Sequence, residues 1–141
     1  MKILDGIYKG VELTAPDDGS ARPTVDHLKK HIRRLTADIK KEIVWDLFAG
    51  TGGVGLEFLS GGSQEVVFVE ELKRVLACLK LNIAECNLKN PSKFSQQNPV
   101  VVQSLVESFL KTPTTTKSPN LIFLDPPYGK NWMEKITPIL N

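Results

Sequence analysis

The chain has 141 residues, of which 41% are hydrophobic and 24% are charged, and its formal net charge is +2. These values fit one soluble globular domain with a single hydrophobic core. The two cysteines, Cys78 and Cys86, lie eight positions apart in one apolar stretch, a spacing that excludes a disulfide framework and a paired metal-ligand motif. Charge and glycine interrupt the N-terminal apolar run, so we expect neither a signal peptide nor a membrane span, but a cytoplasmic protein without a metal.

The first 41 residues predict a small β-hairpin followed by a basic helix. Residues 2–13 contain two short apolar runs interrupted by glycines, and a turn-rich loop follows at 16–20. Thr24 is predicted to cap a helix that runs to about Lys40. Its apolar stripe consists of Leu28, Ile32, Leu35 and Ile39, and the cations Lys29, Lys30, Arg33 and Arg34 fall off that stripe. A solvated helix face and a surface for a polyanion both fit this pattern.

The remaining residues alternate predicted strands with predicted helices. Strands are expected at 42–48, 65–69, 100–103 and 120–124, helices at 54–60, 72–87, 105–110 and 132–140, and a polar loop at 90–98. Such alternation implies βαβ units, with a parallel sheet, helices on both of its faces, and a binding crevice at the carboxyl ends of the strands. We therefore expect an α/β fold.

A glycine-rich turn follows the first predicted strand of this sheet. Gly50, Gly52 and Gly55 satisfy the pattern Gly-x-Gly-x-x-Gly between a strand and a helix, where the backbone can approach a ligand closely. Glu70 ends the next predicted strand, where a carboxylate can accept hydrogen bonds from both hydroxyls of a ribose. The pattern indicates nucleoside binding, although a tight packing turn without a ligand also fits it.

Asp46 discriminates between the two nucleoside cofactors that such a turn can bind. It stands before the glycines at the end of the strand. A carboxylate in that position attracts the ammonium group of a methionine moiety and repels a pyrophosphate. The sequence therefore favours S-adenosylmethionine over a dinucleotide such as NAD.

The motif Asp125-Pro126-Pro127-Tyr128 follows the last predicted strand. An exocyclic amine of a base is a poor nucleophile because its lone pair is delocalised into the ring. If the Asp125 carboxylate and the Pro126 carbonyl each accept one N–H, the nitrogen is drawn toward tetrahedral geometry and its lone pair becomes available. The tandem prolines stiffen this turn, and the Tyr128 ring offers a face on which an extruded base could stack. An ordinary loop of turn-forming residues is the alternative.

Together these residues resemble the bacterial small-subunit rRNA guanine-N2 methyltransferases, over almost the whole chain. The matching elements are Gly6 to Gly10 with Leu13, Arg22-Pro23-Thr24 with Asp26, Asp46 to Gly55 with Glu57, Ser60 and Gly62, Glu70, Asn82, and Asp125 to Tyr128. The resemblance implies a Rossmann-like class I methyltransferase fold. It also implies methyl transfer from S-adenosylmethionine to the N2 amine of a guanine in the 16S rRNA of assembling 30S particles.

The resemblance further implies roles for individual residues. Cofactor contacts are expected from Asp46, Phe48, Ala49, Gly50, Thr51, Gly52, Gly55 and Glu70, and contacts to the target guanine from Asp125, Pro126, Pro127 and Tyr128. RNA contacts are expected from Arg22, Thr24, Lys29, Arg33 and Arg34. We accordingly expect an RNA-facing segment at 1–41 and a cofactor-binding core at 42–141.

Three features depart from the usual pattern of that family. Gln103-Ser104-Leu105 stands where an Asp or Asn usually contacts the adenine, so Ser104 or the backbone is expected to take that role. The helix after Thr24 is more basic than usual. The chain also stops about a strand, a helix and a hairpin earlier than members of the family, so we expect either a C-terminally truncated core that exposes an apolar edge strand or a fold that a partner chain completes.

Two other functions remain compatible with the sequence. One is a truncated, non-catalytic module that binds the cofactor or rRNA without turnover. The other is an amino-methyltransferase that acts on DNA adenine or on a protein glutamine, since an Asp-Pro-Pro-Tyr strand end suits all of these amines and amides.

Overall fold

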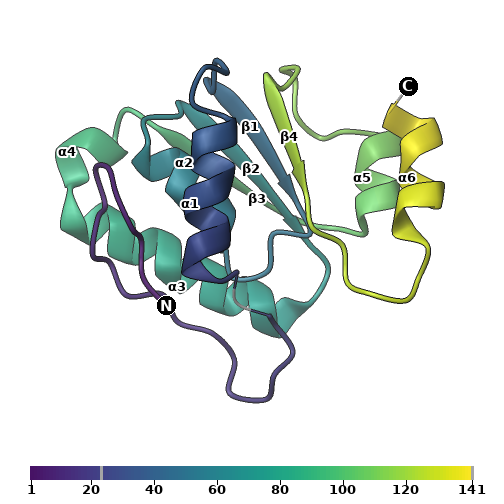
Figure 1. Ribbon diagram of the computed structural model, residues 1–141, viewed down its shortest axis with the longest axis horizontal. Coiled ribbons are helices and arrows are strands. Elements are labelled where there is room, and N and C mark those ends of the chain that lie inside the picture. The colour runs from purple at the N-terminus through teal and green to yellow at the C-terminus, as the bar shows by residue number, and fades with distance from the viewer. Residues whose placement is uncertain (23, 141) are drawn as a thin grey trace.

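The computed structural model describes residues 1–22 and 24–140, so Pro23 of the predicted Arg-Pro-Thr motif lies outside the described residues. Its centre is a four-stranded sheet of β1 (Ile43–Leu47), β2 (Glu65–Glu70), β3 (Asn98–Gln103) and β4 (Leu121–Leu124). The strands lie in the order β3-β2-β1-β4 and every pair is parallel, as the alternation of strands and helices predicts. Figure 1 shows β4 at one edge of this sheet.

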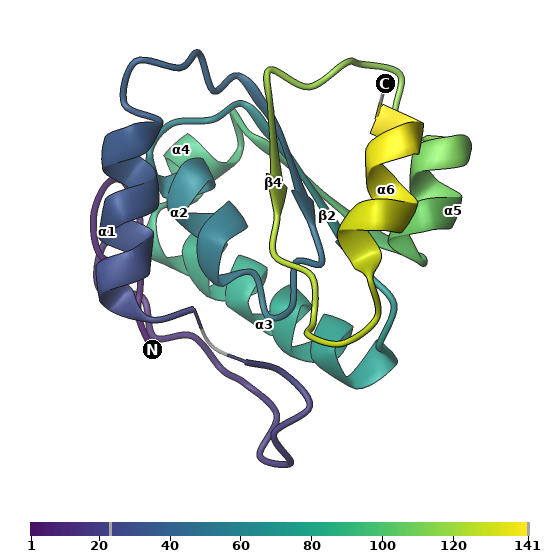
Figure 2. The same ribbon diagram turned by 45° about the vertical axis from the view of Figure 1, so that its right-hand side comes forward.

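Helices cover both faces of the sheet, which confirms the predicted layers. The helices are α1 (Asp26–Leu35), α2 (Gly53–Ser60), α3 (Lys73–Lys89), α4 (Pro91–Phe94), α5 (Val106–Lys111) and α6 (Trp132–Leu140). Figures 1 and 2 show α1 to α4 on one face and the pair α5 and α6 on the other. None of the helices in the described residues is both long and apolar enough to cross a membrane.

The alternation of side chains along β1 and β2 divides the core into two layers. Val44 and Phe68 point toward α2, α3 and the N-terminal segment, whereas Trp45 and Val67 point toward α5 and α6. All four side chains are buried. Because both faces of these strands are covered, their sequences are almost continuously apolar, and this is why they were predictable.

The N-terminal segment forms the predicted hairpin, but with less strand pairing than expected. Its paired part is a single antiparallel bridge between Lys2 and Glu12, and Ile3 and Tyr8 are buried in the same layer as Val44. Ser60 at the end of α2 anchors the turn, since its hydroxyl accepts a hydrogen bond from the Tyr8 amide at 2.9 Å. The hairpin is therefore held mainly by contacts with α2.

Two predicted elements differ from those observed. Helix α1 ends at Leu35, five residues before the predicted end, and its N-cap is Val25 without a side-chain hydrogen bond, so the prediction of a Thr24 cap is wrong. The loop predicted at 90–98 contains α4. The Asn90 side chain accepts a hydrogen bond from the Lys93 amide, which caps this short helix.

Candidate functional site

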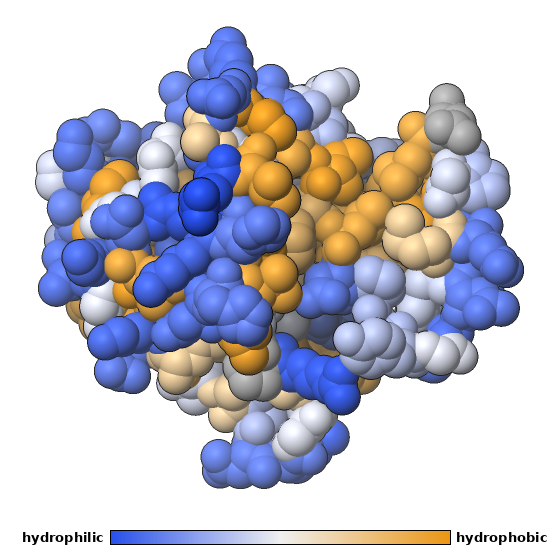
Figure 3. Space-filling model, in the orientation of Figure 1, coloured by the Kyte–Doolittle hydropathy of each residue, from blue (hydrophilic) through white to orange (hydrophobic). Residues whose placement is uncertain are grey.

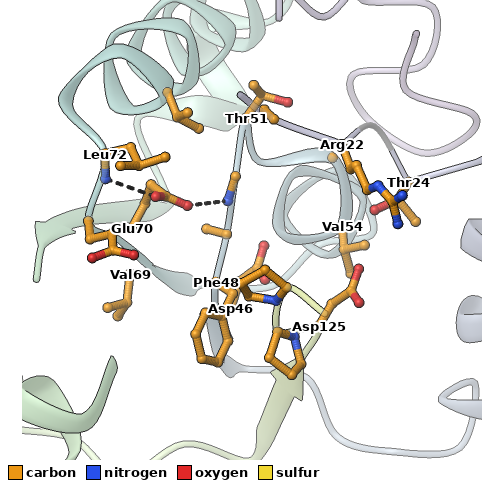
Figure 4. Close-up of a pocket in the computed structure, with 18 of the residues that line it drawn as sticks. Arg22, Thr24, Asp46, Phe48, Thr51, Val54, Val69, Glu70, Leu72 and Asp125 are labelled. Carbon is orange, nitrogen blue, oxygen red and sulfur yellow. Dashed lines mark hydrogen bonds between the residues drawn. The ribbon is translucent and has the colours of Figure 1, made fainter. Parts of the chain in front are cut away.

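The carboxyl ends of the strands border a cavity of about 570 Å³. Most of the predicted site residues line it, namely Arg22, Thr24, Asp46, Phe48, Ala49, Gly50, Thr51, Glu70, Ser104, Asp125, Pro126, Pro127 and Tyr128. Figure 4 shows Glu70 and Phe48 on one side of this space and Arg22 and Asp125 on the other. The volume lies in the range of pockets for small molecules and cofactors. The cavity thus joins the glycine turn to the Asp-Pro-Pro-Tyr motif.

The glycine turn uses its three glycines in different ways. Gly50 lines the cavity, and its φ of 57° lies in the left-handed region. Gly52 and Gly55 are not among the lining residues: a Cβ on Gly52 would lie 2.5 Å from Leu79, and a Cβ on Gly55 would lie 2.3 Å from Phe68. The lack of a side chain at both positions permits close packing of the turn and of α2, and their direct contact with a cofactor stays a prediction.

The carboxylate of Glu70 is held by the backbone on both sides. One oxygen accepts a hydrogen bond from the Gly50 amide at 3.0 Å, and the other accepts one from the Leu72 amide at 2.9 Å. Figure 4 shows this bridge at the edge of the cavity. Each carboxylate oxygen keeps a second lone pair, so Glu70 can still accept hydrogen bonds from a ligand while its orientation is fixed.

Asp46 lies beneath the glycine turn and is only 2% exposed. Burial raises the pKa of its carboxyl to about 7, and a hydrogen bond from the Gly55 amide at 2.9 Å partly offsets that rise. The negative charges of Asp125 and Glu70 also contribute to this raised pKa. A cationic group in the cavity would compensate for this concentration of carboxylates.

The Asp-Pro-Pro-Tyr motif projects from the end of β4 with Asp125 and Tyr128 exposed. Tyr128 is 87% exposed, and the Arg22 guanidinium lies 5.0 Å from the centroid of its ring. This cation–π contact joins the N-terminal segment to the motif across the mouth of the cavity. Sequence reasoning placed both residues near the substrate but gave no sign that they touch.

Two of the three RNA contacts predicted on α1, Lys29 and Arg33, lie on its inner face and pair with carboxylates. Lys29 is buried, and its ammonium donates to the Lys2 carbonyl at 2.8 Å and pairs with Glu57 at 3.4 Å. Arg33 pairs with the same Glu57 carboxylate at 3.4 Å and with Asp5 at 3.6 Å. Lys29 is therefore unavailable to phosphate, and Arg33 is already occupied by carboxylates. Arg34 is exposed.

Several apolar lining residues were not predicted as site residues, although Leu105 was noted as a departure from the family pattern. Leu72 and Leu105 are 46% and 48% exposed and line the cavity directly after β2 and β3, beside Ser104. Trp132 closes another wall, where its ring meets Phe48 edge to face at 5.2 Å between centroids. The position of both leucines immediately after strands was the signal that could have identified them.

Asn82 ties the glycine turn to the N-terminal loop. Its buried amide donates to the carbonyls of Thr51 and Thr14, at 2.9 and 3.0 Å, and its oxygen accepts from the Thr14 amide at 2.7 Å. All hydrogen-bonding groups of Asn82 except one lone pair are thereby used. The loop that follows Thr14 lines the cavity from Gly19 onward, so Asn82 fixes one of its walls.

The cavity contains no cluster of metal ligands. Among residues 1–22 and 24–140, no group of three or more His, Cys, Asp or Glu side chains is arranged to hold a metal ion. Both cysteines are free, and Cys86 is buried in α3.

Comparison with known proteins identifies the family. A family model described as "Conserved hypothetical protein 95" matches residues 1–141. "Ribosomal RNA small subunit methyltransferase D" of Haemophilus influenzae is 32% identical over 141 residues, which are 99% of this chain and 70% of that relative. The protein of the same name from Escherichia coli is 29% identical over 141 residues, which are 99% of this chain and 66% of that relative.

A solved structure agrees with these sequence matches. The protein described as "Putative methyltransferase yhhF from Escherichia coli" superposes with a TM-score of 0.79 at 30% identity, covering 99% of this chain and 71% of that chain. Its likeness confirms the predicted Rossmann-like class I methyltransferase fold. The chain therefore belongs to the family of ribosomal RNA small subunit methyltransferase D.

Proposed function

We propose that the protein transfers a methyl group from S-adenosylmethionine to the exocyclic N2 amine of a guanine in small-subunit rRNA. One observation carries this proposal: a single cavity is bordered by the glycine turn with Asp46 and Glu70 and by the strand end of Asp125 and Pro126. A cofactor and an amine bound at these two places would meet in the same space. The names of the relatives supply the rRNA substrate.

The lining residues fit the chemical groups of S-adenosylmethionine. The buried Asp46 carboxylate suits the cationic ammonium of the methionine part, and Glu70 suits the ribose hydroxyls. Leu72 and Leu105 offer apolar surface for the adenine, with Ser104 beside them as a polar group. When bound, the cofactor supplies an activated methyl group on a sulfonium, so neither a metal nor a covalent protein nucleophile is required.

The Asp125 carboxylate and the Pro126 carbonyl are the groups that position the target amine. Each accepts one N–H of the exocyclic nitrogen in the proposed complex, and this directs the nitrogen lone pair toward the methyl group. Pro126 and Pro127 carry no amide hydrogen, so the turn offers acceptors to the amine without competing donors. Tyr128 provides a ring on which the extruded guanine stacks, a contact worth about 1–3 kcal/mol.

The partner in this proposal is the assembling 30S subunit, and a protein that modifies it would act in the cytoplasm. Methyl transfer to 30S subunits that lack the modification tests the proposal. The chain is incubated with these subunits and isotope-labelled S-adenosylmethionine, and the rRNA is digested to nucleosides for mass spectrometry. We expect labelled N2-methylguanosine.

Other outcomes of this experiment identify the competing functions. Cofactor binding by isothermal titration without any methylated product supports a non-catalytic module. Label in adenine of duplex DNA or in a protein glutamine supports a different amino-methyltransferase. Absence of cofactor binding contradicts the enzymatic proposal for this chain.

A further inference from the structure

The outward face of α1 presents four nitrogen-bearing side chains in a single stripe: His27, Lys30, His31 and Arg34. We propose that this stripe is the surface on which substrate RNA docks beside the cavity, with phosphates held by the two cations and unpaired bases by the two imidazoles. The inference rests on the proposed function; of the RNA contacts predicted on α1 it keeps Arg34, and it replaces Lys29 and Arg33 by Lys30 and the two histidines.

Helix geometry separates the stripe from the anchored face of α1. At about 100° per residue, the four positions fall within about 100° of arc around the helix axis. Lys29 and Arg33 fall on the opposite side, where Glu57 binds both. Because Glu57 fixes the inward face, the outward face cannot rotate away from solvent without breaking these ion pairs.

The cations of the stripe are free to bind an anion. All four side chains are exposed, and among the described residues neither Lys30 nor Arg34 lies within ion-pair distance of a carboxylate. Asp26 is the only acidic residue of α1, and its carboxylate pairs with Lys29 at 3.5 Å. The positive charge of the stripe is therefore not neutralised within the protein.

The stripe begins at the mouth of the cavity. Val25 and Leu28 at the start of α1 line the cavity, and Arg22, just before them, lies over the Tyr128 ring. Figure 3 shows hydrophilic side chains gathered over α1 and apolar ones between α1 and α6. An RNA strand on the stripe would thus run directly to the place where the proposed target base enters.

The composition of the stripe favours RNA over a lipid surface. A helix that lies on a membrane buries an apolar face in the lipid, whereas the arc of the stripe carries four polar side chains, and the exposed Leu28 and Leu35 lie to one side of it. Imidazole rings can stack on unpaired bases and donate N–H groups to RNA, which suits recognition of single-stranded regions.

Removal of the two cations tests the proposal. The double variant Lys30→Gln/Arg34→Gln is compared with Lys89→Gln/Lys111→Gln, which loses the same charge at exposed positions at the ends of α3 and α5. Binding of a 16S rRNA transcript is measured across a salt series. We expect the α1 variant to reduce the slope of log K against log salt by about 1.4, since a single-stranded phosphate contact contributes about 0.7.

Steady-state methylation of 30S subunits provides a second measurement. We expect a higher KM with an unchanged kcat for the α1 variant, because the stripe docks RNA and does not touch the reacting atoms. His27→Ala/His31→Ala should weaken binding with a smaller change in salt slope. Unaltered thermal unfolding of each variant verifies that the fold is retained.

Three results would overturn the inference. In one, the α1 and control variants bind RNA alike while the wild type methylates 30S subunits. This result contradicts the role of the stripe in RNA docking but leaves the proposed function intact. In another, the α1 variant loses binding only to phosphatidylserine vesicles, which assigns the stripe to membranes. In the third, the wild type binds no RNA and methylates none, and then the proposed function fails as well.

Discussion

Asp46 and Asp125 both line the cavity, but their exposure to solvent differs. Asp46 is buried beneath the glycine turn with a raised pKa, whereas Asp125 is exposed at the end of β4. A buried carboxylate with few partners is suited to a permanent cation, and an exposed one is suited to a group that arrives with the substrate. The two residues therefore have separable effects on cofactor binding and on methyl transfer.

Asp125→Ala tests the second role. We expect kcat to fall by about 10³-fold, a loss typical of a preorganised polar group at a reacting centre, while the dissociation constant for S-adenosylmethionine stays within a few-fold of the wild-type value. Single-turnover methylation and isothermal titration give the two quantities. An equal loss of cofactor affinity would place Asp125 in the cofactor site and contradict the assignment.

The raised pKa of Asp46 predicts two effects of pH. The native state keeps the Asp46 proton up to about pH 7, whereas the unfolded carboxyl loses it near 3.8, so the free protein loses stability as the pH rises between these values. A cationic ligand favours the ionised carboxyl, so affinity for S-adenosylmethionine should increase over the same range. Titration calorimetry from pH 5.5 to 8 measures this increase.

Methylthioadenosine is the matched ligand for this measurement, since it lacks the amino-acid part of the cofactor. Its affinity should change little with pH, and Asp46→Asn should flatten the pH profile for S-adenosylmethionine. Profiles of the same steepness for both ligands would show that another group titrates.

The sequence predicted which polar residues line the cavity better than it predicted the burial of Lys29. Asp46, Glu70 and Asp125 stand at the ends of apolar strands, and parallel strands bring those ends together. The burial of Lys29 depends on Glu57, which is distant in sequence and is brought near by the packing of α2. Local periodicity carries no information about such a partner.

At the scale of elements, α1 is held to the core by buried ion pairs together with the partly buried Ile32. Glu57 accepts hydrogen bonds from the Leu4 amide at 2.7 Å, from Lys29 and from Arg33, and it is only 3% exposed. The apolar stripe that predicts this helix lies partly outside the core, since Leu35 is 69% exposed. The existence of the helix could thus be predicted, but its orientation could not.

Glu57→Ala should loosen α1 and the cavity wall that it forms. Removing one partner of a buried ion pair costs about 3–5 kcal/mol, and here it leaves the buried Lys29 ammonium with only the exposed Asp26 carboxylate, 3.5 Å away. Lys29→Met keeps the buried stem, and Glu57 retains Arg33 and the Leu4 amide, so its cost should be smaller. Urea denaturation of both variants gives the free energies of unfolding, and equal costs would contradict this ranking.

At the scale of the whole molecule, β4 is an edge of the sheet. Within the described residues it pairs only with β1, and its four apolar side chains are half-buried. Figure 3 shows apolar side chains gathered between α1 and α6, where Figure 1 places β4. The exposed apolar edge strand expected from the sequence is therefore present, and such an edge offers unpaired backbone groups to other strands.

This edge predicts self-association of the chain in solution. Sedimentation velocity should show an average mass that increases with protein concentration. Ile122→Thr keeps a β-branched shape but removes apolar surface, so it should reduce the effect. Leu88→Thr, at a side chain of α3 that is 73% exposed, is the control and should not. A constant monomer mass for the wild type would contradict the prediction.

The cavity is built from segments that lie far apart in the sequence, since Met1 and Arg22 line it together with Tyr128 and Trp132. The lining of the cavity is therefore complete only when β4 and α6 have packed against the rest of the sheet. A ligand bound there stabilises only the completely folded chain, by an amount that increases with its concentration above the dissociation constant. Resistance to proteolysis should therefore increase with the concentration of such a ligand.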